Sequence, residues 1–494
     1  MLWLVLYLPR LPLEVFPGLP SPSAIVSHER VVVADRAAAL AGVIPGLRLA
    51  EAWAFLPTLS VHQRDVEREQ TALTRLACWA GTFTSEICCL PPRTLLLEVA
   101  GSLRLFGGVA MLFERVVAGC AEQGFAVQAA LAPTPLAAQW LARAGDDEVC
   151  LDVAQLPQRL GRLPLSVLDF SPETQARLGN FGARLLADVL RLPRAALARR
   201  LGAGFAADLA RALGDLPDPR PRFVFPEYFA ERLELPARIE NAMTLAFAGR
   251  RLITTLCGWL AARSAGISEC RFEFAHERGA RQRPATVLVL AFATATRDAE
   301  RIARVLGERL PRLELPAAVE LVSLYAEALE ALPGRTASLF GESSEAAAGD
   351  AVAALVERLR ARLGKDAVHA LSTVAEHRPE NASRRVSPWL VKGGKSAAGL
   401  RAASGMPDTP PGPRPLWLLA RPRALREVAG RPQCGGPLRL LAGPERIESG
   451  WWDAAEPAAL GDVRRDYFVA ISVRAQWLWI FRSRAGWFLH GVFA

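Results

Sequence analysis

Arginine dominates the charged side chains of this sequence. All but three of its 59 basic residues are arginine, and with 50 acidic residues the formal net charge is +9. A guanidinium group forms paired hydrogen bonds with phosphate, so a nucleic acid is one candidate partner. Arginine also accumulates together with alanine and leucine through genomic base composition, so the charge alone leaves the partner open.

The side chains that usually bind metals or carry out covalent catalysis show no such pattern. The eight cysteines contain no CxxC pair, and the six histidines are scattered along the chain. Disulfides and metal sites both need closer or more regular spacing. The sequence therefore predicts no metal site, no cofactor and a reducing, cytoplasmic location.

The length and composition indicate several folded domains. The chain has 494 residues, of which 51% are hydrophobic and 22% charged, so about two to four domains can each bury a core. The apolar run from Met1 to Leu8 has no preceding basic residue and is followed by Pro9, which favours a buried strand over a secretory signal. No stretch is long and apolar enough to predict a membrane-spanning helix.

Hydrophobic periodicity predicts a mixed α/β segment followed by a helical one. Residues 1–160 alternate short apolar strands with helices, expected over 2–8, 68–80, 94–99, 109–122 and 125–131. Residues 161–222 have the pattern of a basic helical module with short loops. Together they indicate a multidomain α/β protein.

Residues 226–328 follow a proline-rich connection and predict a second α/β unit. We expect strands at 229–235, 267–274, 287–292 and 319–325, and helices at 241–263 and 297–310. The order strand, helix, strand, strand, helix, strand is that of the ferredoxin-like split unit. Its sheet would leave one face uncovered by helices and available to a partner.

The last part of the chain predicts a connector, a linker and a small β-rich module. Residues 329–415 contain a helix at 345–363 and, from 378, a flexible linker rich in proline, glycine, serine and arginine. Residues 416–494 carry six of the twelve tryptophans. Trp451 and Trp452 cannot both face inward from one strand, so at least one is a candidate partner-binding residue. The alternative is that the tryptophans form the core of the module.

Two motifs give the first 328 residues a family resemblance. The segment Leu97 to Gly107, Leu-Glu-Val-Ala-Gly-Ser-Leu-Arg-Leu-Phe-Gly, resembles the palm segment of the Y-family translesion DNA polymerases. Residues 41–57 are similar to the fingers segment of that family. The resemblance implies a palm at 1–160 with fingers inserted at roughly 10–78, a thumb at 161–222 and a ferredoxin-like little finger at 226–328.

The sequence departs from this family where catalysis takes place. Y-family polymerases hold two Mg²⁺ ions with carboxylates, and the matching positions here are Tyr7, Arg93 and Thr94. The metals stabilise the attacking and leaving oxygens, so carboxylates are required there. The residues that would grip the triphosphate correspond to Arg36 and Ala39. The resemblance therefore implies no catalytic residues and a protein that is not an enzyme; an active polymerase with an atypical metal site is the alternative.

The resemblance places DNA contacts on the little finger and the thumb. Arg271 alternates with Phe272 and Phe274, and Arg297 follows the next strand as a DNA-contacting arginine of the family does. In the thumb, helix-hairpin-helix turns bring main-chain N–H groups to phosphate. The candidate phosphate contacts there are Arg177, Arg184 and Arg194, although each could equally be a solvated helix residue.

A short segment after the little finger resembles the peptides that bind the bacterial sliding clamp. Residues 336–340 keep Leu339 and Phe340, whose side chains would enter an apolar pocket, and have Thr336 in place of glutamine, with Ser338 between them. We expect this segment to bind the clamp. The alternative is that it docks the connector onto its own domain.

The tail extends the resemblance to nearly the whole chain. Residues 443–452, 464–467 and 487–491 are similar to the C-terminal signature of the non-catalytic, polymerase-like subunits of bacterial mutagenesis complexes. The resemblance implies an adaptor for DNA repair by SOS-induced, mutagenic translesion synthesis. Its partners would be damaged or primer-template DNA, the sliding clamp, an error-prone C-family DNA polymerase and a RecA-like accessory protein, with no membrane. A pure protein adaptor without DNA binding is a further alternative.

Overall fold

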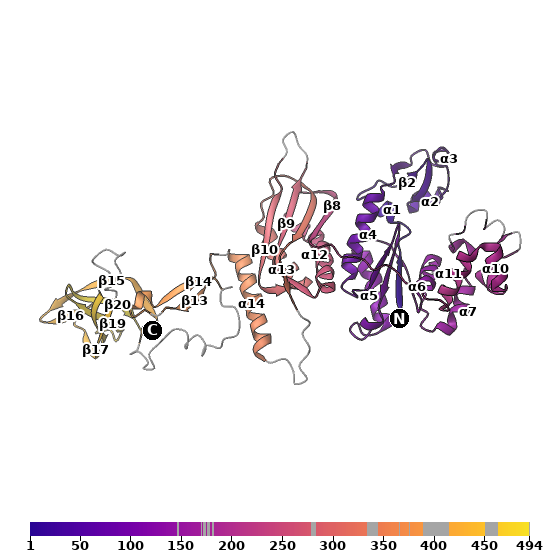
Figure 1. Cartoon of the computed structure of the whole chain (residues 1–494). Coiled ribbons are helices and arrows are strands. Elements are labelled where there is room, and N and C mark those ends of the chain that lie inside the picture. Colours follow the sequence, from indigo (N-terminus) through magenta and orange to yellow (C-terminus); the bar gives the residue numbers. More distant parts are fainter. Residues whose placement is uncertain are drawn as a thin grey trace. The chain divides into compact units, whose positions relative to one another are not determined.

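The protein divides into two compact units, residues 1–362 and 363–494. The computed structural model describes the chain except for residues 146–147, 169, 171–173, 175–177, 180–181, 278–282, 333–343, 365, 375, 389–413, 450–462 and 494. The side chains of residues 194–196, 200, 344–350 and 463 are not described either. Figure 1 shows the helices and strands of both units, and each unit is described by itself below.

A four-stranded antiparallel sheet forms the core of the N-terminal segment. Its strands are β1 (Trp3–Tyr7), β5 (Ile87–Leu90), β6 (Thr94–Glu98) and β7 (Gln128–Ala132), in the order β5-β6-β1-β7. Helices α4 (Val66–Ala80) and α5 (Val109–Glu122) share an apolar core with Leu4 and Leu6, whereas α6 (Pro135–Ala144) packs against Val5 on the other face. Because helices cover both faces, β1 is a continuous apolar run, as predicted.

Residues between β1 and α4 form a small separate layer. It contains α1 (Leu11–Glu14), β2 (Ser23–Ser27), β3 (Arg30–Ala34), α2 (Arg36–Leu40), α3 (Leu49–Phe55) and β4 (Ser60–Gln63), with the strands in the order β3-β2-β4. Asp35 begins α2, since its Oδ1 accepts a 2.8 Å hydrogen bond from the Ala38 N–H and its Oδ2 accepts one from the Ser23 N–H. This layer has its own core, formed around Val26, Val31 and Leu49.

The predicted helical module follows α6. Among the described residues its helices are α7 (Leu156–Gly161), α9 (Leu186–Leu190), α10 (Arg194–Leu201) and α11 (Ala203–Leu213). Leu160, Leu186 and Leu209 are buried in the same apolar cluster as Trp140 of α6. The module is thus built directly onto one face of the N-terminal sheet.

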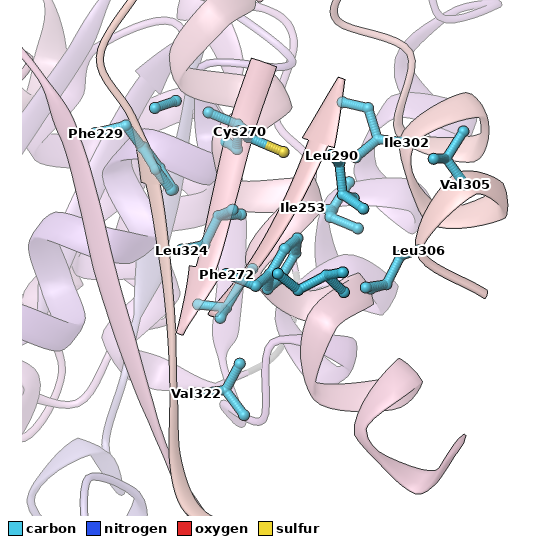
Figure 2. Close-up of a cluster of buried hydrophobic side chains, with 14 of the residues drawn as sticks. Phe229, Ile253, Cys270, Phe272, Leu290, Ile302, Val305, Leu306, Val322 and Leu324 are labelled. Carbon is cyan, nitrogen blue, oxygen red and sulfur yellow. The ribbon is translucent and has the colours of Figure 1, made fainter. Parts of the chain in front are cut away.

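The second α/β unit has the predicted order of elements. These are β8 (Phe229–Ile239), α12 (Leu245–Ala262), β9 (Ala265–His276), β10 (Thr286–Thr296), α13 (Ala299–Arg309) and β11 (Val319–Ala326), followed by the short β12 (Leu329–Ala331). The sheet order is β10-β9-β11-β8, with all neighbours antiparallel. Figure 2 shows Phe272 and Leu324 of the central strands pointing into one cluster with Ile253 of α12 and Ile302 of α13. Both helices cover this face, so the face that carries Arg271 stays open.

Two glycines allow helix α12 of the second α/β unit to pack closely against α4 of the N-terminal segment. Gly81 follows α4 and Gly258 lies within α12; a Cβ on Gly258 would lie 2.4 Å from the carbonyl oxygens of Cys78 and Trp79. A Cβ on Gly81 would lie 2.5 Å from the Gly258 carbonyl oxygen. The two helices therefore touch through their main chains, a contact that only glycine permits.

Helix α14 (Ser344–Leu363) follows β12 and ends at the boundary between the units. The C-terminal unit contains the hairpin β13 (Ala370–Thr373) and β14 (Ser383–Val386), and a six-stranded sheet. The sheet strands are β15 (Trp417–Val428), β16 (Arg431–Gln433), β17 (Arg439–Ser449), β18 (Val463–Ile471), β19 (Trp477–Ser483) and β20 (Gly486–Val492), in the order β16-β15-β20-β19-β18-β17. The prediction of a β-rich C-terminal module is confirmed.

The structure differs from the prediction at the beginning of the linker. Arg378 is only 4% exposed and binds Glu376 through a 2.8 Å ion pair. Glu376 also accepts a 2.9 Å hydrogen bond from Ser449 Oγ, and Glu380 forms a 2.9 Å ion pair with Arg465 of β18. These charged residues tie the segment to the sheet, so residues 378–388 are part of the folded unit and not of a linker.

No helix in the described part of the chain is long and apolar enough to span a membrane.

Candidate functional site

The three positions singled out as lost metal ligands meet at one end of the N-terminal sheet. Tyr7, the last residue of β1, lies opposite Thr94, the first residue of β6, and opposite Gln128 of β7. The Leu8 N–H donates a 2.9 Å hydrogen bond to the Arg93 carbonyl oxygen. The Arg93 guanidinium donates to the Pro9 carbonyl oxygen at 3.2 Å. Strand pairing therefore brings Tyr7, Arg93 and Thr94 together although they lie far apart in the sequence.

Positive charge surrounds this end of the sheet. The Arg143 guanidinium carbon lies 5.9 Å from the centre of the Tyr7 ring, and Arg93 directly precedes β6. Thr94 is buried, with 3% of its surface exposed. Guanidinium groups cannot bind Mg²⁺, and a threonine hydroxyl and a phenol are poor ligands for it in comparison with carboxylates.

Glu14 is the acidic residue nearest in sequence to β1, and its carboxylate has another partner. Both of its oxygens accept from the Ala126 N–H at 3.2 Å. Burial raises the pKa of Glu14, against the lowering effects of that hydrogen bond and of Arg10. Among the described residues, no group of three or more histidine, cysteine, aspartate or glutamate side chains could hold a metal ion.

The open face of the second sheet carries Arg271 between two acidic residues. On β9, the Arg271 guanidinium carbon lies 4.5 Å from the centre of the Tyr325 ring of β11. Arg271 forms an ion pair with Glu273 two residues along the strand and a second, 3.6 Å pair with Glu327. The Arg271 side chain is 38% exposed, and the two ion pairs largely compensate its charge.

Arg297 lies one residue beyond the end of β10. Its Nη1 donates a 3.4 Å hydrogen bond to the Leu332 carbonyl oxygen, and the side chain is half-buried. The structure thus places Arg271 and Arg297 on the same sheet, with Arg297 held by the segment that follows β12.

The helical module presents Arg184 at its surface, next to a glycine turn. The Arg184 N–H donates to Asp188 Oδ2 at 3.0 Å, while the side chain is exposed. The Gly182 N–H donates to the Gly179 carbonyl oxygen at 2.9 Å, and Gly182 has φ +73°, which favours glycine. Arg194 begins α10, but its side chain is not described, and Arg177 lies outside the described residues.

The predicted clamp-binding and tail residues fall mostly outside the described part of the chain. This holds for Thr336, Ser338, Leu339 and Phe340, and for Trp451 and Trp452. In the described part of the tail, Trp479 and Trp487 are buried, whereas Trp417 is 71% and Trp477 51% exposed. The module therefore contains both buried and exposed tryptophans. The exposure of Trp417 and Trp477 was not predictable, because alternation alone does not tell which face of an antiparallel sheet is covered.

The C-terminal sheet also contains a buried polar cluster that no motif in the sequence indicates. Tyr467 Oη lies 2.8 Å from His490 Nδ1 and accepts a 3.1 Å hydrogen bond from Arg465. Burial raises the pKa of Tyr467 to about 12 and lowers the pKa of His490, while Glu380 acts to raise the latter. All three side chains have partners within the sheet and its hairpin, so this cluster is structural.

The order of elements and the β-α-β-β-α-β unit together give the chain a Y-family polymerase-like fold, with an additional C-terminal β module. More particularly, the chain is similar over most of its length to the protein ImuB. It is 28% identical to "Protein ImuB" of Caulobacter vibrioides strain NA1000 / CB15N over 472 residues, which cover 92% of this chain and 100% of that protein. The ImuB of C. vibrioides strain ATCC 19089 / CIP 103742 / CB 15 gives the same values.

Similar solved structures include DinB from Sulfolobus solfataricus and an insertion ternary complex of Dbh DNA polymerase. Each is 14% identical with a TM-score of 0.38; they cover 66% and 68% of this chain and 98% and 100% of their own chains. No family model matches the chain.

Proposed function

We propose that this chain is a cytoplasmic, non-catalytic adaptor in DNA-damage-induced, mutagenic translesion synthesis. It binds primer-template or damaged DNA and the sliding clamp, and it recruits an error-prone C-family polymerase and a RecA-like accessory protein. The observation that carries the proposal is the meeting of Tyr7, Arg93 and Thr94 at one end of the sheet, where the resemblance requires carboxylates.

Electrostatics supports the absence of nucleotidyl transfer. A dication about 4 Å from a guanidinium group would be destabilised by roughly 8 kcal/mol at an effective dielectric constant near 20. Arginine stays charged at all working pH values, so deprotonation cannot relieve this repulsion. Glu14 could supply one carboxylate to an atypical site, but two Mg²⁺ ions need several.

DNA binding is supported by the open sheet face with Arg271 and Arg297 and by the exposed Arg184 beside its glycine turn. The ion pairs of Arg271 with Glu273 and Glu327 favour a second candidate function, a pure protein adaptor without DNA binding. The two functions differ in one measurable property, the affinity for a primer-template duplex and its dependence on salt.

Primer extension and DNA binding, measured on the same preparation, test the proposal. We expect no extension with Mg²⁺ or Mn²⁺ and binding that weakens steeply with salt. Arg250→Ala is the matched control for Arg271→Ala, because Arg250 is exposed on α12, away from the open face, and also forms an ion pair, with Glu300. Extension that survives removal of contaminating polymerases would refute the non-catalytic role, and absent DNA binding would leave the pure adaptor.

A further inference from the structure

Helix α14 reverses the usual pattern of an amphipathic helix. It buries a glutamate and exposes large apolar side chains. Glu357 and Ala361 are buried, with 2% and 6% exposure. The exposed residues are Val352 (60%), Leu355 (53%), Leu359 (38%) and Leu363 (55%). Isolated exposed leucines are common, but this set has the regular spacing of three and four residues that places side chains on one face of a helix.

A buried ion pair fixes the orientation of the helix. Glu357 accepts a 2.8 Å hydrogen bond from Arg301 Nε of α13, and Arg301 Nη2 binds the same carboxylate. The Ala293 N–H of β10 donates to Glu357 at 2.7 Å. Because β10 is an edge strand, this N–H has no neighbouring strand to bind. Rotating the helix would leave Arg301 without its charged partner and would remove the hydrogen bonds of the Glu357 carboxylate, which is costly.

The exposed stripe therefore points away from the domain that carries the helix. At 3.6 residues per turn, Val352 and Leu359 lie roughly 140 to 180° around the helix from Glu357 and Ala361. Ala361 belongs to the apolar cluster of the second α/β unit, which places the opposite face outward. Leucine and valine at such spacing form the contact line of paired helices.

The charges beside the stripe indicate what covers it. The charged side chains from residue 351 to the end of the helix are the buried Glu357 and three arginines, Arg358, Arg360 and Arg362; Arg358 is exposed and forms a 3.9 Å pair with Glu308 of α13. A second copy of this chain would bring arginines against arginines. We propose that the exposed face of α14 binds an amphipathic helix of a partner protein whose apolar stripe is flanked by acidic side chains. This surface lies outside the tail and does not depend on DNA binding or on the proposed function.

Binding of two matched synthetic helices to the full-length protein tests this proposal. Both peptides have four heptads with leucine at positions a and d; one has glutamate at e and g, the other lysine. By fluorescence anisotropy, we expect the glutamate peptide to bind at least tenfold more tightly than the lysine peptide. The double variant Leu355→Asp, Leu359→Asp should weaken binding at least tenfold, and Leu105→Asp, at a residue 80% exposed elsewhere, should not change it.

A variant with reversed charges beside the apolar stripe tests the same proposal if the leucine variant folds poorly. Arg358→Glu together with Arg362→Glu should reverse the preference toward the lysine peptide. Equal binding of both peptides, no binding of either, or no effect of the charge exchange would overturn the proposal. Sedimentation that detects a dimer abolished by the leucine substitutions would also overturn it, because the occupant would then be a second copy.

Discussion

Glu357→Ala should release α14 from the domain that holds it. The side chain is 1% exposed and accepts hydrogen bonds from Arg301 and from the Ala293 N–H at 2.7 Å. Removing one partner of a buried ion pair costs about 3 to 5 kcal/mol, since the other charge is left unpaired. Arg301 is 14% exposed and can regain some water, so we expect about 2 to 3 kcal/mol. At 1.4 kcal/mol for each factor of ten, the detached helix becomes roughly 30 to 150 times more populated.

Limited trypsin digestion of the native protein measures this population. Cleavage after Arg358, Arg360 and Arg362 needs local unfolding of α14, so its initial rate follows the detached fraction when reattachment is fast. We expect the initial rate of cleavage, followed by mass spectrometry, to rise roughly 30- to 150-fold. The thermal midpoint of the whole protein should move little, because α14 lies at the edge of its unit.

Glu308→Ala is the matched control for this substitution. Glu308 of α13 forms a 3.9 Å ion pair with Arg358 of α14. This pair is partly exposed and contributes at most about 1 kcal/mol. Cleavage should then rise less than about sixfold. A change below threefold for Glu357→Ala, or equal changes for both variants, would refute the reasoning that the buried pair holds the helix.

Four further predictions concern the proposed function. The protein should add no nucleotide to a primer in Mg²⁺ or Mn²⁺, and metal-dependent extension by a rigorously purified sample would contradict this. Replacing Arg271 and Arg297 with alanine should lower both DNA affinity and the salt slope of binding, because fewer counterions are released; unchanged titrations would favour the pure adaptor. The double variant Leu339→Ala, Phe340→Ala should weaken clamp binding at least tenfold, since each buried side chain contributes roughly 1.5 to 3 kcal/mol before ordering costs, and wild-type affinity would place the motif elsewhere. A chain ending at Pro415 should keep DNA and clamp binding but lose the partner polymerase or the RecA-like protein in pull-downs, and retention of both would refute recruitment by the tail.

The elements of the fold were predictable because their periodicity is regular. The run Leu2 to Leu8 is apolar without alternation, as a strand covered on both faces must be, and the order of elements from 229 to 326 follows directly from the change between periods of two and of 3.6. The orientation of α14 was not predictable. Its regularly spaced leucines would ordinarily mark the buried face, and only the positions of Arg301 and the free edge of β10 explain why Glu357 is buried instead.

The sequence indicates which residues belong to the candidate site, but it does not indicate which other side chains lie around them. The motif around Glu98 identifies Arg93 and Thr94 by simple counting, yet the pairing of Thr94 with Tyr7 follows from the register of β1 and β6. Arg143 was missed because its helix reaches Tyr7 only through the sheet topology. The ion pairs of Arg271 were missed for a related reason, since Glu327 comes from a different strand end.

The main-chain contact between Gly81 and Gly258 limits how this protein can exchange parts with its relatives. Residues 226–331 form a five-stranded sheet with two helices on one face, and such sheet units are natural candidates for exchange between related chains by recombination. A transplanted unit would nevertheless need a residue without a side chain at the position of Gly258, because any Cβ there would lie 2.4 Å from two carbonyl oxygens. In hybrids with a larger residue at this position, the second α/β unit should lie farther from the N-terminal sheet or no longer pack against it, even if each part folds.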